Sequence, residues 1–308
     1  MSAPVTVTGG SGFIGSSVVD ALIDAGYDVR ILDTQSPYRG DVDWRPVDLL
    51  DLAGLTAALK GSGPVIHLAA MADVNDVIVS PARSVEINVG GTVNVLEAAR
   101  QAGAGRVVLA STVWVYDATR GARVDETSSF DVDTNRHLYV STKIAGELMC
   151  RDFLNLYGRP YTVLRLGIPY GPRMRPNTVL ASFFRRALAG EPLHIDGDGR
   201  QERNFVYVED LARAFVHALG PEAENTTINV NGSKPVSIRR LAELTAELVP
   251  GVQVEYGPSR PGDLTPRVVV SERAGDILGW TPAVTIEDGV RRTFEWYVAA
   301  HSVELARD

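Results

Sequence analysis

Cysteine is nearly absent from the sequence, since Cys150 is the only one among 308 residues. A single thiol excludes an intramolecular disulfide and argues against a cysteine-based metal cluster. The five histidines are scattered without the spacing of metal ligands, so we expect no bound metal. Cys150 follows an apolar helical pattern, which favours a buried thiol that packs as a small apolar residue over a nucleophile.

Long apolar runs and an excess of positive charge are also missing. The first apolar stretch is interrupted by glycines and is too short to span a bilayer, and no targeting segment is visible. We therefore expect a protein of the reducing cytoplasm with no membrane partner. Acidic residues outnumber basic residues by 38 to 30, which gives a formal net charge of −8. This balance also disfavours nucleic acid as a partner.

The first half of the chain alternates short apolar runs with amphipathic stretches. Apolar and β-branched runs predict six strands, at residues 5–8, 27–33, 44–49, 65–68, 106–111 and 161–166. Helical periodicity predicts helices over residues 16–25, 85–102 and 139–157. This alternation is typical of an α/β fold with a doubly wound parallel sheet of the Rossmann type.

A glycine-rich loop joins the first predicted strand to the first predicted helix. Gly9, Gly12 and Gly15 lie three residues apart in this loop. Glycines at this spacing allow a tight turn, close approach of the backbone to a pyrophosphate, and close packing of helix on strand. The phosphates then bind to free N–H groups at the start of the helix, so the loop predicts a dinucleotide site.

Asp33 ends the second predicted strand and indicates which dinucleotide binds. A carboxylate at this place hydrogen-bonds the hydroxyls of the adenosine ribose and repels a 2′-phosphate. No Arg or Lys follows directly, since the next residues are Thr34, Gln35 and Ser36. We therefore expect NAD, rather than NADP, as the cofactor.

Tyr139 and Lys143 lie four residues apart in a predicted helix, and Ser111 and Thr112 end an apolar run. A phenol, an ammonium and a hydroxyl beside a nicotinamide form a proton-transfer site for alcohol–ketone chemistry. Unperturbed tyrosine has a pKa of about 10, and we expect the neighbouring ammonium and the positive nicotinamide to lower the pKa of Tyr139. The alternative interpretation of the pair is a solvated helix face with an i, i+4 contact.

The second half of the chain follows a different pattern. Helices are predicted at residues 179–189, 210–219 and 237–249, and strands at residues 193–195 and 203–208. Ser237 is placed to cap the last of these helices.

From these motifs, the chain resembles the extended short-chain dehydrogenase/reductase family, in particular its NAD-dependent sugar-nucleotide epimerases and dehydratases. The resemblance runs almost end to end. Its motifs are modest alone but specific in their order and spacing. They are residues 8–15, 48–49, 67–70, 88–94, 111–112, 115–116, 139–143, 170–172 and 197–210.

The resemblance implies a set of cofactor contacts. Asp48 and Leu49 are expected to contact the adenine, and residues 68–70 to line the cofactor cleft. Lys143 is expected to reach the nicotinamide ribose as well. The cofactor-binding residues that we expect are Gly9, Gly12, Phe13, Ile14, Gly15, Asp33, Asp48, Leu49, Leu68, Ala69, Ala70, Asn88, Tyr139 and Lys143.

The resemblance also implies the catalytic residues. Tyr139 and Lys143 act with Thr112, and Ser111 is a supporting group one residue earlier. Tyr139 removes the proton of a sugar hydroxyl, and Thr112 hydrogen-bonds the same oxygen.

Arginines of the second half are implied to bind a nucleoside-diphosphate sugar. Arg203 and Arg260 match positions that hold the diphosphate, which suits forked guanidiniums. Arg173 and Arg175 are candidates for binding a carboxylate if the sugar is a uronic acid. We expect an NAD-binding domain over residues 1–168 and a mainly nucleotide-sugar-binding domain over residues 169–308, with part of 203–220 returning to the first domain.

Three residues depart from the family pattern. Ile168 stands where many relatives have an asparagine that touches the substrate. Val113 and Trp114 stand where related 4,6-dehydratases carry Asp-Glu, and related decarboxylases place Glu at the Trp114 position. Neither side chain transfers protons, so dehydration and decarboxylation are disfavoured.

The expected function is therefore epimerisation at C4 of a nucleoside-diphosphate sugar through a transient 4-keto intermediate, which needs no additional acid. One alternative is an NAD(P)H-dependent reductase of a nucleotide-linked keto sugar. Another is a non-catalytic NAD-binding regulator, which would need no phenol–ammonium pair. The family resemblance also implies a homodimer through the helix after Asn88 and the helix that bears Tyr139, to which Leu96, Leu148 and Phe153 could contribute.

Overall fold

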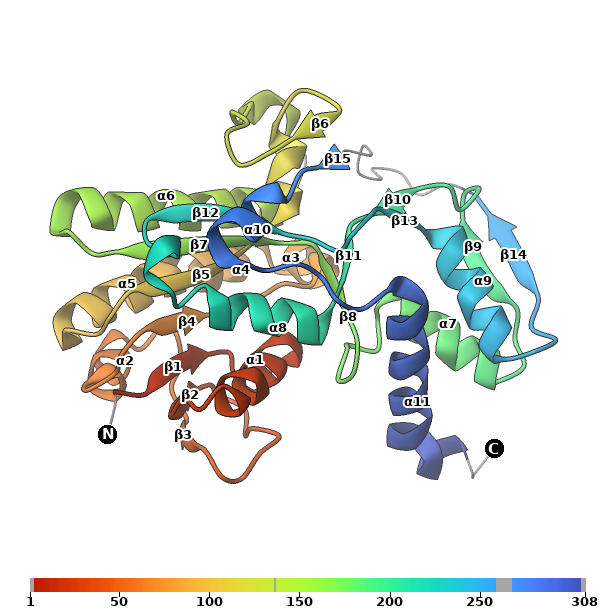
Figure 1. Ribbon diagram of the computed structural model, residues 1–308, viewed down its shortest axis with the longest axis horizontal. Helices are drawn as coiled ribbons and strands as arrows, with labels where there is room; N and C mark the ends of the chain where they lie inside the picture. The colour runs from red at the N-terminus through yellow and green to blue at the C-terminus, as the bar shows by residue number, and fades with distance from the viewer. Residues whose placement is uncertain (1–2, 136, 259–267, 306–308) are drawn as a thin grey trace.

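Seven parallel strands form the central sheet of the computed structural model, which describes residues 3–135, 137–258 and 268–305 (Figure 1). The first strand lies inside the sheet. The chain adds the next two strands on one side of it and the later strands on the other side. In spatial order the strands are β3 (Asp43–Arg45), β2 (Val29–Leu32), β1 (Val5–Thr8), β4 (Val65–His67), β5 (Val107–Thr112), β7 (Tyr161–Leu166) and β12 (Thr226–Val230). The order reverses between β1 and β4, and ligands of open α/β sheets bind at such a switch point.

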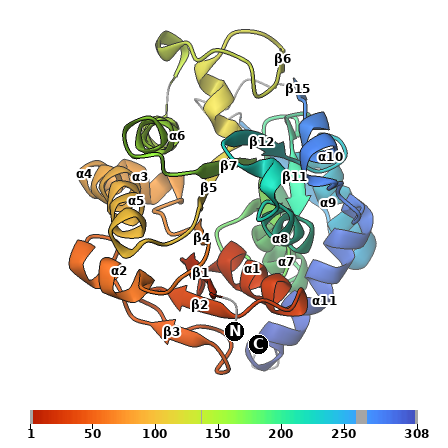
Figure 2. The same cartoon turned by 60° about the vertical axis from the view of Figure 1, so that its left-hand side comes forward.

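Helices cover both faces of this sheet, as Figure 2 shows. One face carries α2 (Leu52–Leu59), α5 (Gly91–Ala102) and α6 (Leu138–Tyr157). The opposite face carries α1 (Phe13–Asp24), α8 (Val208–His217) and α10 (Glu272–Leu278). The predicted doubly wound fold is confirmed.

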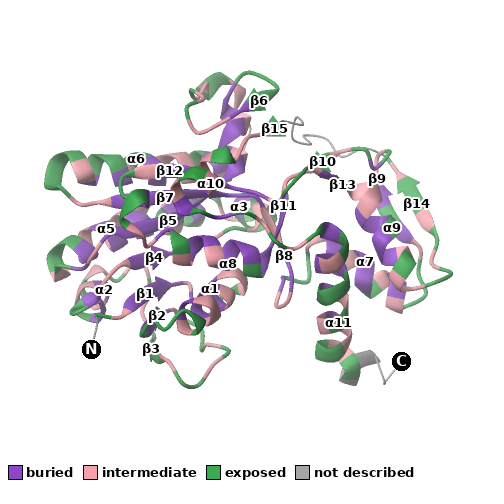
Figure 3. Ribbon diagram, in the orientation of Figure 1, coloured by how far each residue is buried: buried purple, intermediate pink, exposed green. Residues whose placement is uncertain are grey.

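The middle of the sheet is buried on both faces (Figure 3). All residues of β5 and β7 are buried. Continuous apolar strands, rather than alternating ones, are expected where helices cover both sides of a parallel sheet.

A smaller lobe lies at the carboxyl edge of the sheet and has its own apolar core. Its helices are α7 (Val179–Leu188), α9 (Ile238–Leu248) and α11 (Ile286–Leu305). Ser237 caps α9 as predicted, because its hydroxyl accepts a hydrogen bond from the Arg240 N–H at 3.1 Å. Paired short strands complete the lobe: β8 (Ile168–Tyr170) with β11 (Phe205–Tyr207), β9 (Leu193–Asp196) with β14 (Val254–Gly257), and β10 (Glu202–Arg203) with β13 (Val236–Ser237).

Short elements link these layers. α3 (Val74–Val79) and α4 (Pro81–Val85) precede a π-helical turn, Glu86–Gly90, which continues into α5. Short 3-10 turns are Val113–Ala118, Val132–Thr134 and Pro221–Ala223. β6 (Arg123–Val124) pairs with β15 (Val268–Val269) beside the sheet. Within the described ranges, no helix is long and apolar enough to cross a membrane.

Several elements differ from the predicted ones. The strand predicted at residues 44–49 ends at Arg45, because Pro46 has no N–H to donate to a sheet. α2, β12 and α11 lie outside the predicted elements. β12 pairs with β7, and α8 packs on α1, so parts of the second half of the chain return to the sheet.

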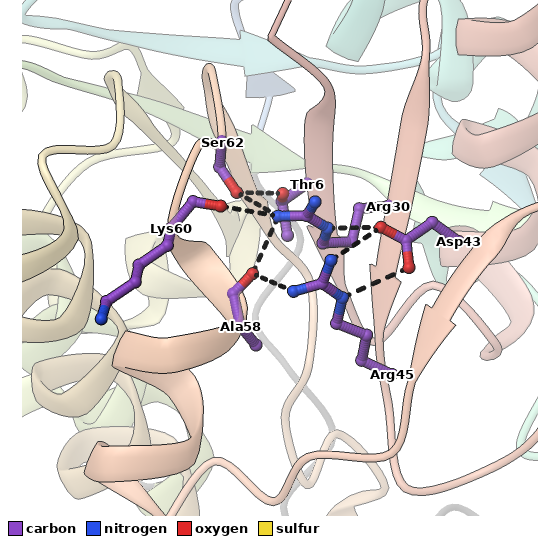
Figure 4. Close-up of polar contacts among 7 residues, drawn as sticks. All are labelled: Thr6, Arg30, Asp43, Arg45, Ala58, Lys60 and Ser62. Carbon is purple, nitrogen blue, oxygen red and sulfur yellow. Dashed lines mark hydrogen bonds and ion pairs between the residues drawn. The ribbon is translucent and has the colours of Figure 1, made fainter.

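A buried arginine fastens α2 to the sheet. Arg30 of β2 is 8% exposed and donates to the carbonyl oxygens of Ala58 and Lys60 and to the Ser62 hydroxyl (Figure 4). Its Nε donates to Asp43 at 2.7 Å. The two carbonyls lie at the carboxyl end of α2, where a cation is favoured by the helix dipole.

Replacing Arg30 tests this arrangement. Arg30→Leu leaves buried carbonyl and hydroxyl groups without their donor, and we expect it to lower the free energy of unfolding by about 2–4 kcal/mol. Arg45→Leu is the matched control, because Arg45 shares the Asp43 and Ala58 partners but has a side chain 37% exposed. It should cost less than about 1 kcal/mol. Equal losses for the two variants in denaturant titrations would refute a special role for Arg30.

Candidate active site

The glycine loop follows β1 at the switch point of the sheet. Gly9 has φ +73°, and a Cβ there would lie 2.6 Å from the backbone nitrogen of Ala69. A Cβ on Gly15 would overlap the Gly9 carbonyl oxygen. The loop therefore requires glycine at these two positions: Gly9 for its positive φ and its close approach to the Ala69 backbone, and Gly15 for close packing of α1 on the loop.

The loop leaves the start of α1 open for an anion. Gly12 is the N-cap of α1 and provides no side-chain cap, so Phe13 and Ile14 begin the helix with uncapped backbone N–H groups. Free N–H groups and the positive end of the helix dipole bind phosphate. These residues fit the pyrophosphate of NAD.

Asp33 lies directly after β2, and its carboxylate is hydrogen-bonded to the glycine loop. One of its carboxylate oxygens accepts from Ser11 N–H at 3.0 Å and the other from Gln35 N–H at 2.9 Å. An ionised carboxylate accepts several hydrogen bonds, so the fixed oxygens can also take ribose hydroxyls. The role of Asp33 in binding the ribose stays a prediction.

The turn after β3 carries Asp48 and Leu49. Asp48 accepts from the Leu50 N–H at 2.9 Å, and the Leu49 carbonyl accepts from the amide of Asn94 at 2.9 Å. The Leu49 side chain packs on Gly91 of α5. The turn is thus fixed from α5 at the edge of the expected adenine site.

Residues 68–70 follow β4 and face the glycine loop. Leu68 N–H donates to the Thr8 carbonyl at 3.1 Å, and Ala69 lies against Gly9, with Ala70 the next residue. Asn88 is buried, and its amide both accepts from Met71 N–H and donates to Met71 O. Asn88 therefore holds this wall of the cleft in place from inside the protein.

His67 joins the glycine loop to α5 through two hydroxyls. Thr92 donates its hydrogen to the Asn88 carbonyl at 2.6 Å, so its oxygen accepts from His67 Nε2 at 3.0 Å. His67 Nδ1 is then the acceptor for the Thr8 hydroxyl at 2.7 Å. Burial, together with the charge of Lys143, lowers the pKa of His67 to about 3, so the ring is neutral at physiological pH.

Tyr139 and Lys143 project from the first turns of α6. The Lys143 ammonium lies 5.8 Å from the centre of the Tyr139 ring and donates to the Ala110 carbonyl at 3.0 Å. Burial lowers the pKa of Lys143 to about 8, although the negative charge of Glu147 acts in the opposite direction. Lys143 is therefore mainly cationic at neutral pH.

The protein's own groups do not lower the pKa of Tyr139, so the expected lowering depends on the positive nicotinamide and stays a prediction. Burial raises the pKa of Tyr139 to about 12, and the charge of Arg175 only partly offsets this. The phenol is therefore protonated at neutral pH, because desolvation of the phenolate outweighs the nearby positive charges.

Ser111 and Thr112 end β5 and point to different surroundings. Ser111 is buried, and its hydroxyl donates to Glu147 of α6 at 2.6 Å. Thr112 is 9% exposed, and its hydroxyl oxygen accepts from Trp114 N–H at 3.2 Å. Ser111 thus faces the interior, whereas Thr112 borders the 3-10 turn that carries Trp114.

A buried ion pair that the sequence analysis did not assign lies behind these residues. Both carboxylate oxygens of Glu147 accept from Arg165 of β7, at 3.0 and 2.7 Å, and the side chains are 1% and 2% exposed. Arg165 also donates to the Tyr116 hydroxyl, which donates to Asn229 of β12. Tyr139, Lys143 and Glu147 recur every four residues, which is the sequence signal for one shared helix face.

The four arginines lie in different places. Arg203 lies in β10 and donates to the Glu202 carbonyl at 2.8 Å. Arg260 lies outside the described residues. Arg173 has φ +65° and donates to Asp20, in the second half of α1, at 2.8 Å.

Arg175, two residues after Arg173, lies near a different carboxylate. Its guanidinium lies 3.8 Å from the Asp73 carboxylate, which also accepts from the Asn177 amide. Its charge acts on the phenol of Tyr139. Of the two candidates for binding a sugar carboxylate, Arg175 is the one whose charge acts on Tyr139, whereas Arg173 pairs with Asp20.

Comparison with known proteins agrees with this architecture. The model of the NAD dependent epimerase/dehydratase family matches residues 5–231. The chain belongs to this family. Its members include sugar-nucleotide enzymes of the extended short-chain dehydrogenase/reductase type, and its cofactor is NAD.

Relatives within the family catalyse different reactions. The chain is 34% identical to a UDP-glucose 4-epimerase of Mycolicibacterium smegmatis, over 94% of this chain and 97% of the relative. It is 29% identical to dTDP-glucose 4,6-dehydratase 1 of Escherichia coli, over 96% and 92%. A crystal structure of MoeE5 with UDP-glucuronic acid and NAD superposes with a TM-score of 0.87, at 31% identity, and covers 96% of this chain and 99% of that one.

The charge on Glu147 should set the pH range in which Lys143 is cationic. Glu147 raises the pKa of Lys143, so Glu147→Gln should lower that pKa further below about 8. The ammonium would then be lost at lower pH, and the alkaline limb of the turnover profile should move down by about one pH unit.

Ser111→Ala is the control for this change. It removes the hydroxyl that donates to Glu147 but keeps the charge, so the alkaline limb should stay in place even if the rate falls. A folded Glu147→Gln protein whose alkaline limb matches that of the unmodified protein would contradict the assignment.

Proposed function

We propose that the protein is an NAD-dependent epimerase that inverts C4 of a nucleoside-diphosphate sugar through a transient 4-keto intermediate. The observation that carries this proposal is the juxtaposition of Tyr139 and Lys143 with the Thr112–Trp114 turn. The two residues after Thr112 are Val113 and Trp114, neither of which can act as the additional acid of a dehydratase.

The chain supplies the proton chemistry of this reaction. NAD, when bound, accepts the C4 hydrogen as hydride and later returns it. Tyr139 takes the proton of the C4 hydroxyl and gives it back after the keto sugar has turned, while Thr112 hydrogen-bonds the same oxygen. Because burial raises the pKa of Tyr139 to about 12 even with the opposing charge of Arg175, the phenolate depends on the Lys143 cation and on the positive charge of the oxidised nicotinamide.

The substrate would lie between the sheet and the smaller lobe. Arg203 and Arg260, which the family resemblance pairs on the diphosphate, come from the second half of the chain. Arg175, whose positive charge acts on Tyr139, would favour a carboxylate on the sugar, which makes a uronic acid a substrate to include in any test. A uronate would compete with Asp73 for this guanidinium.

A reductase of a nucleotide-linked keto sugar is the second candidate, since the same phenol can protonate a ketone. It would release oxidised cofactor after each turnover, whereas an epimerase recycles bound NAD. Retention of NAD through purification therefore supports the epimerase, and consumption of added reduced cofactor supports the reductase. A regulator that only binds NAD would turn over no sugar nucleotide.

The test is a panel of UDP-, dTDP- and GDP-linked hexoses and UDP-uronic acids, with products followed by NMR. We expect interconversion of C4 isomers without added cofactor. Tyr139→Phe should slow turnover by about 10²–10⁴-fold, because general acid–base catalysis is lost, and should keep NAD bound. No interconversion with any sugar in the panel, or full activity of Tyr139→Phe, would refute the proposal.

We also propose that the protein forms a homodimer through α5 and α6. Leu96 and Phe153 are buried in the core, so interior packing already explains them. Leu148 is 45% exposed on α6, with Leu156 and Tyr157 also exposed further along. Exposed apolar side chains on one helix favour a contact surface.

Leu148→Glu should shift the sedimentation behaviour from dimer to monomer, because it places a charge in an apolar contact. Tyr256→Glu, at a comparably exposed aromatic residue of β14, should leave the dimer intact. A monomeric unmodified protein at micromolar concentration would exclude the dimer.

A further inference from the structure

Trp114 lies between the two hydroxyl groups that the proposed function assigns to catalysis. Its backbone N–H donates to the Thr112 hydroxyl oxygen at 3.2 Å. Its ring meets the ring of Tyr139 edge-on, with centroids 6.2 Å apart and an interplanar angle of 90°. The indole is partly exposed, so it borders open space rather than the core.

Neighbouring side chains hold the indole in this position. It packs against a small apolar cluster that includes Val113, Val115 and Tyr116. On another side its ring lies 6.2 Å from that of His137, the residue before α6. The ring is therefore fixed from behind, and its remaining surface faces the volume beside Tyr139.

That volume must contain the sugar if Tyr139 and Thr112 bind the C4 oxygen. The carbons bonded to C4 then lie within reach of Trp114, whose backbone bonds Thr112 and whose ring meets Tyr139. An indole presents an apolar face, and its single N–H is a donor only. It can pack on the C–H groups of a sugar ring but cannot transfer a proton to it.

We propose that Trp114 is a specificity-determining residue that forms the wall of the sugar subsite and keeps the 4-keto intermediate in the cleft until the hydrogen is returned. The inference rests on the proposed epimerase function. Related dehydratases and decarboxylases carry Glu at this position, where the acid directs the intermediate to another reaction. Here the inference assigns to Trp114 the role of retaining the intermediate.

Retention matters because the half-reactions must stay coupled. In the first half-reaction the C4–H bond breaks and its electron pair passes to NAD, while the hydroxyl proton passes to Tyr139. If the keto sugar then leaves, reduced cofactor and a protonated phenol remain. Such a protein cannot oxidise another alcohol, so each escape ends a catalytic cycle.

The experiment compares Trp114→Ala, Trp114→Phe and the unmodified protein, each purified with its NAD. The measured quantity is the ratio of released keto sugar, trapped by borodeuteride so that its C4 carries deuterium, to unlabelled C4 epimer formed from the substrate found in the panel. Absorbance of reduced nicotinamide gives an independent measure of the same escape. We expect Trp114→Ala to raise the ratio by about tenfold or more, and Trp114→Phe to restore most of the retention.

Phe130→Ala is the control for loosened packing. Phe130 packs against the same apolar cluster, but its ring lies 5.2 Å from the Arg165 guanidinium instead of beside Tyr139. Its ratio should equal that of the unmodified protein. A similar rise in Phe130→Ala would assign the escape to general loosening and would overturn the inference.

The remaining outcomes separate the inference from the proposed function. A folded Trp114→Ala protein that epimerises with an unchanged ratio overturns the inference and leaves the function intact. Loss of the first half-reaction in Trp114→Ala, seen as no reduced cofactor and no keto sugar, also overturns it, because Trp114 would then only orient Tyr139. An unmodified protein that epimerises no sugar nucleotide overturns both.

Discussion

The buried pair of Glu147 and Arg165 is the interaction on which the geometry of the catalytic cleft depends. It joins α6 to β7 with two hydrogen bonds, and Ser111 of β5 adds a third bond to the same carboxylate. Two opposite charges buried together need not stabilise a protein, but they restrict how its elements can pack. A carboxylate fixed at position 147 sets the rotation of α6, and with it the direction in which Tyr139 and Lys143 leave the helix.

The cofactor side of the cleft is organised by the order of the strands. β1 and β4 are paired neighbours at the switch point, and the loops that follow these two strands are in contact at Gly9 and Ala69. Asn88 and Thr92 reach this junction from the helical segment on one face of the sheet. The parts expected to hold the cofactor and the parts expected to act on the substrate are thus anchored to neighbouring strands of one sheet.

Much of this architecture could be predicted from the sequence, because apolar runs and glycine spacing are local signals. β12 was harder to predict, since its pairing with β7 joins residues far apart in the chain. The pKa of Tyr139 could not be predicted either, because burial depends on the whole cleft. Arg173 and Arg175 are the same residue type two positions apart, but in the fold Arg173 pairs with Asp20 and Arg175 lies near Asp73.

The neutral ring of His67 limits how hydrogen ions can be transferred to and from Lys143. Its Nδ1 and Nε2 are both engaged, and burial together with the charge of Lys143 keeps its pKa near 3. A ring in this condition cannot accept a hydrogen ion from Lys143 across the physiological pH range. The interior behind Lys143 is therefore closed to relay of hydrogen ions through this histidine.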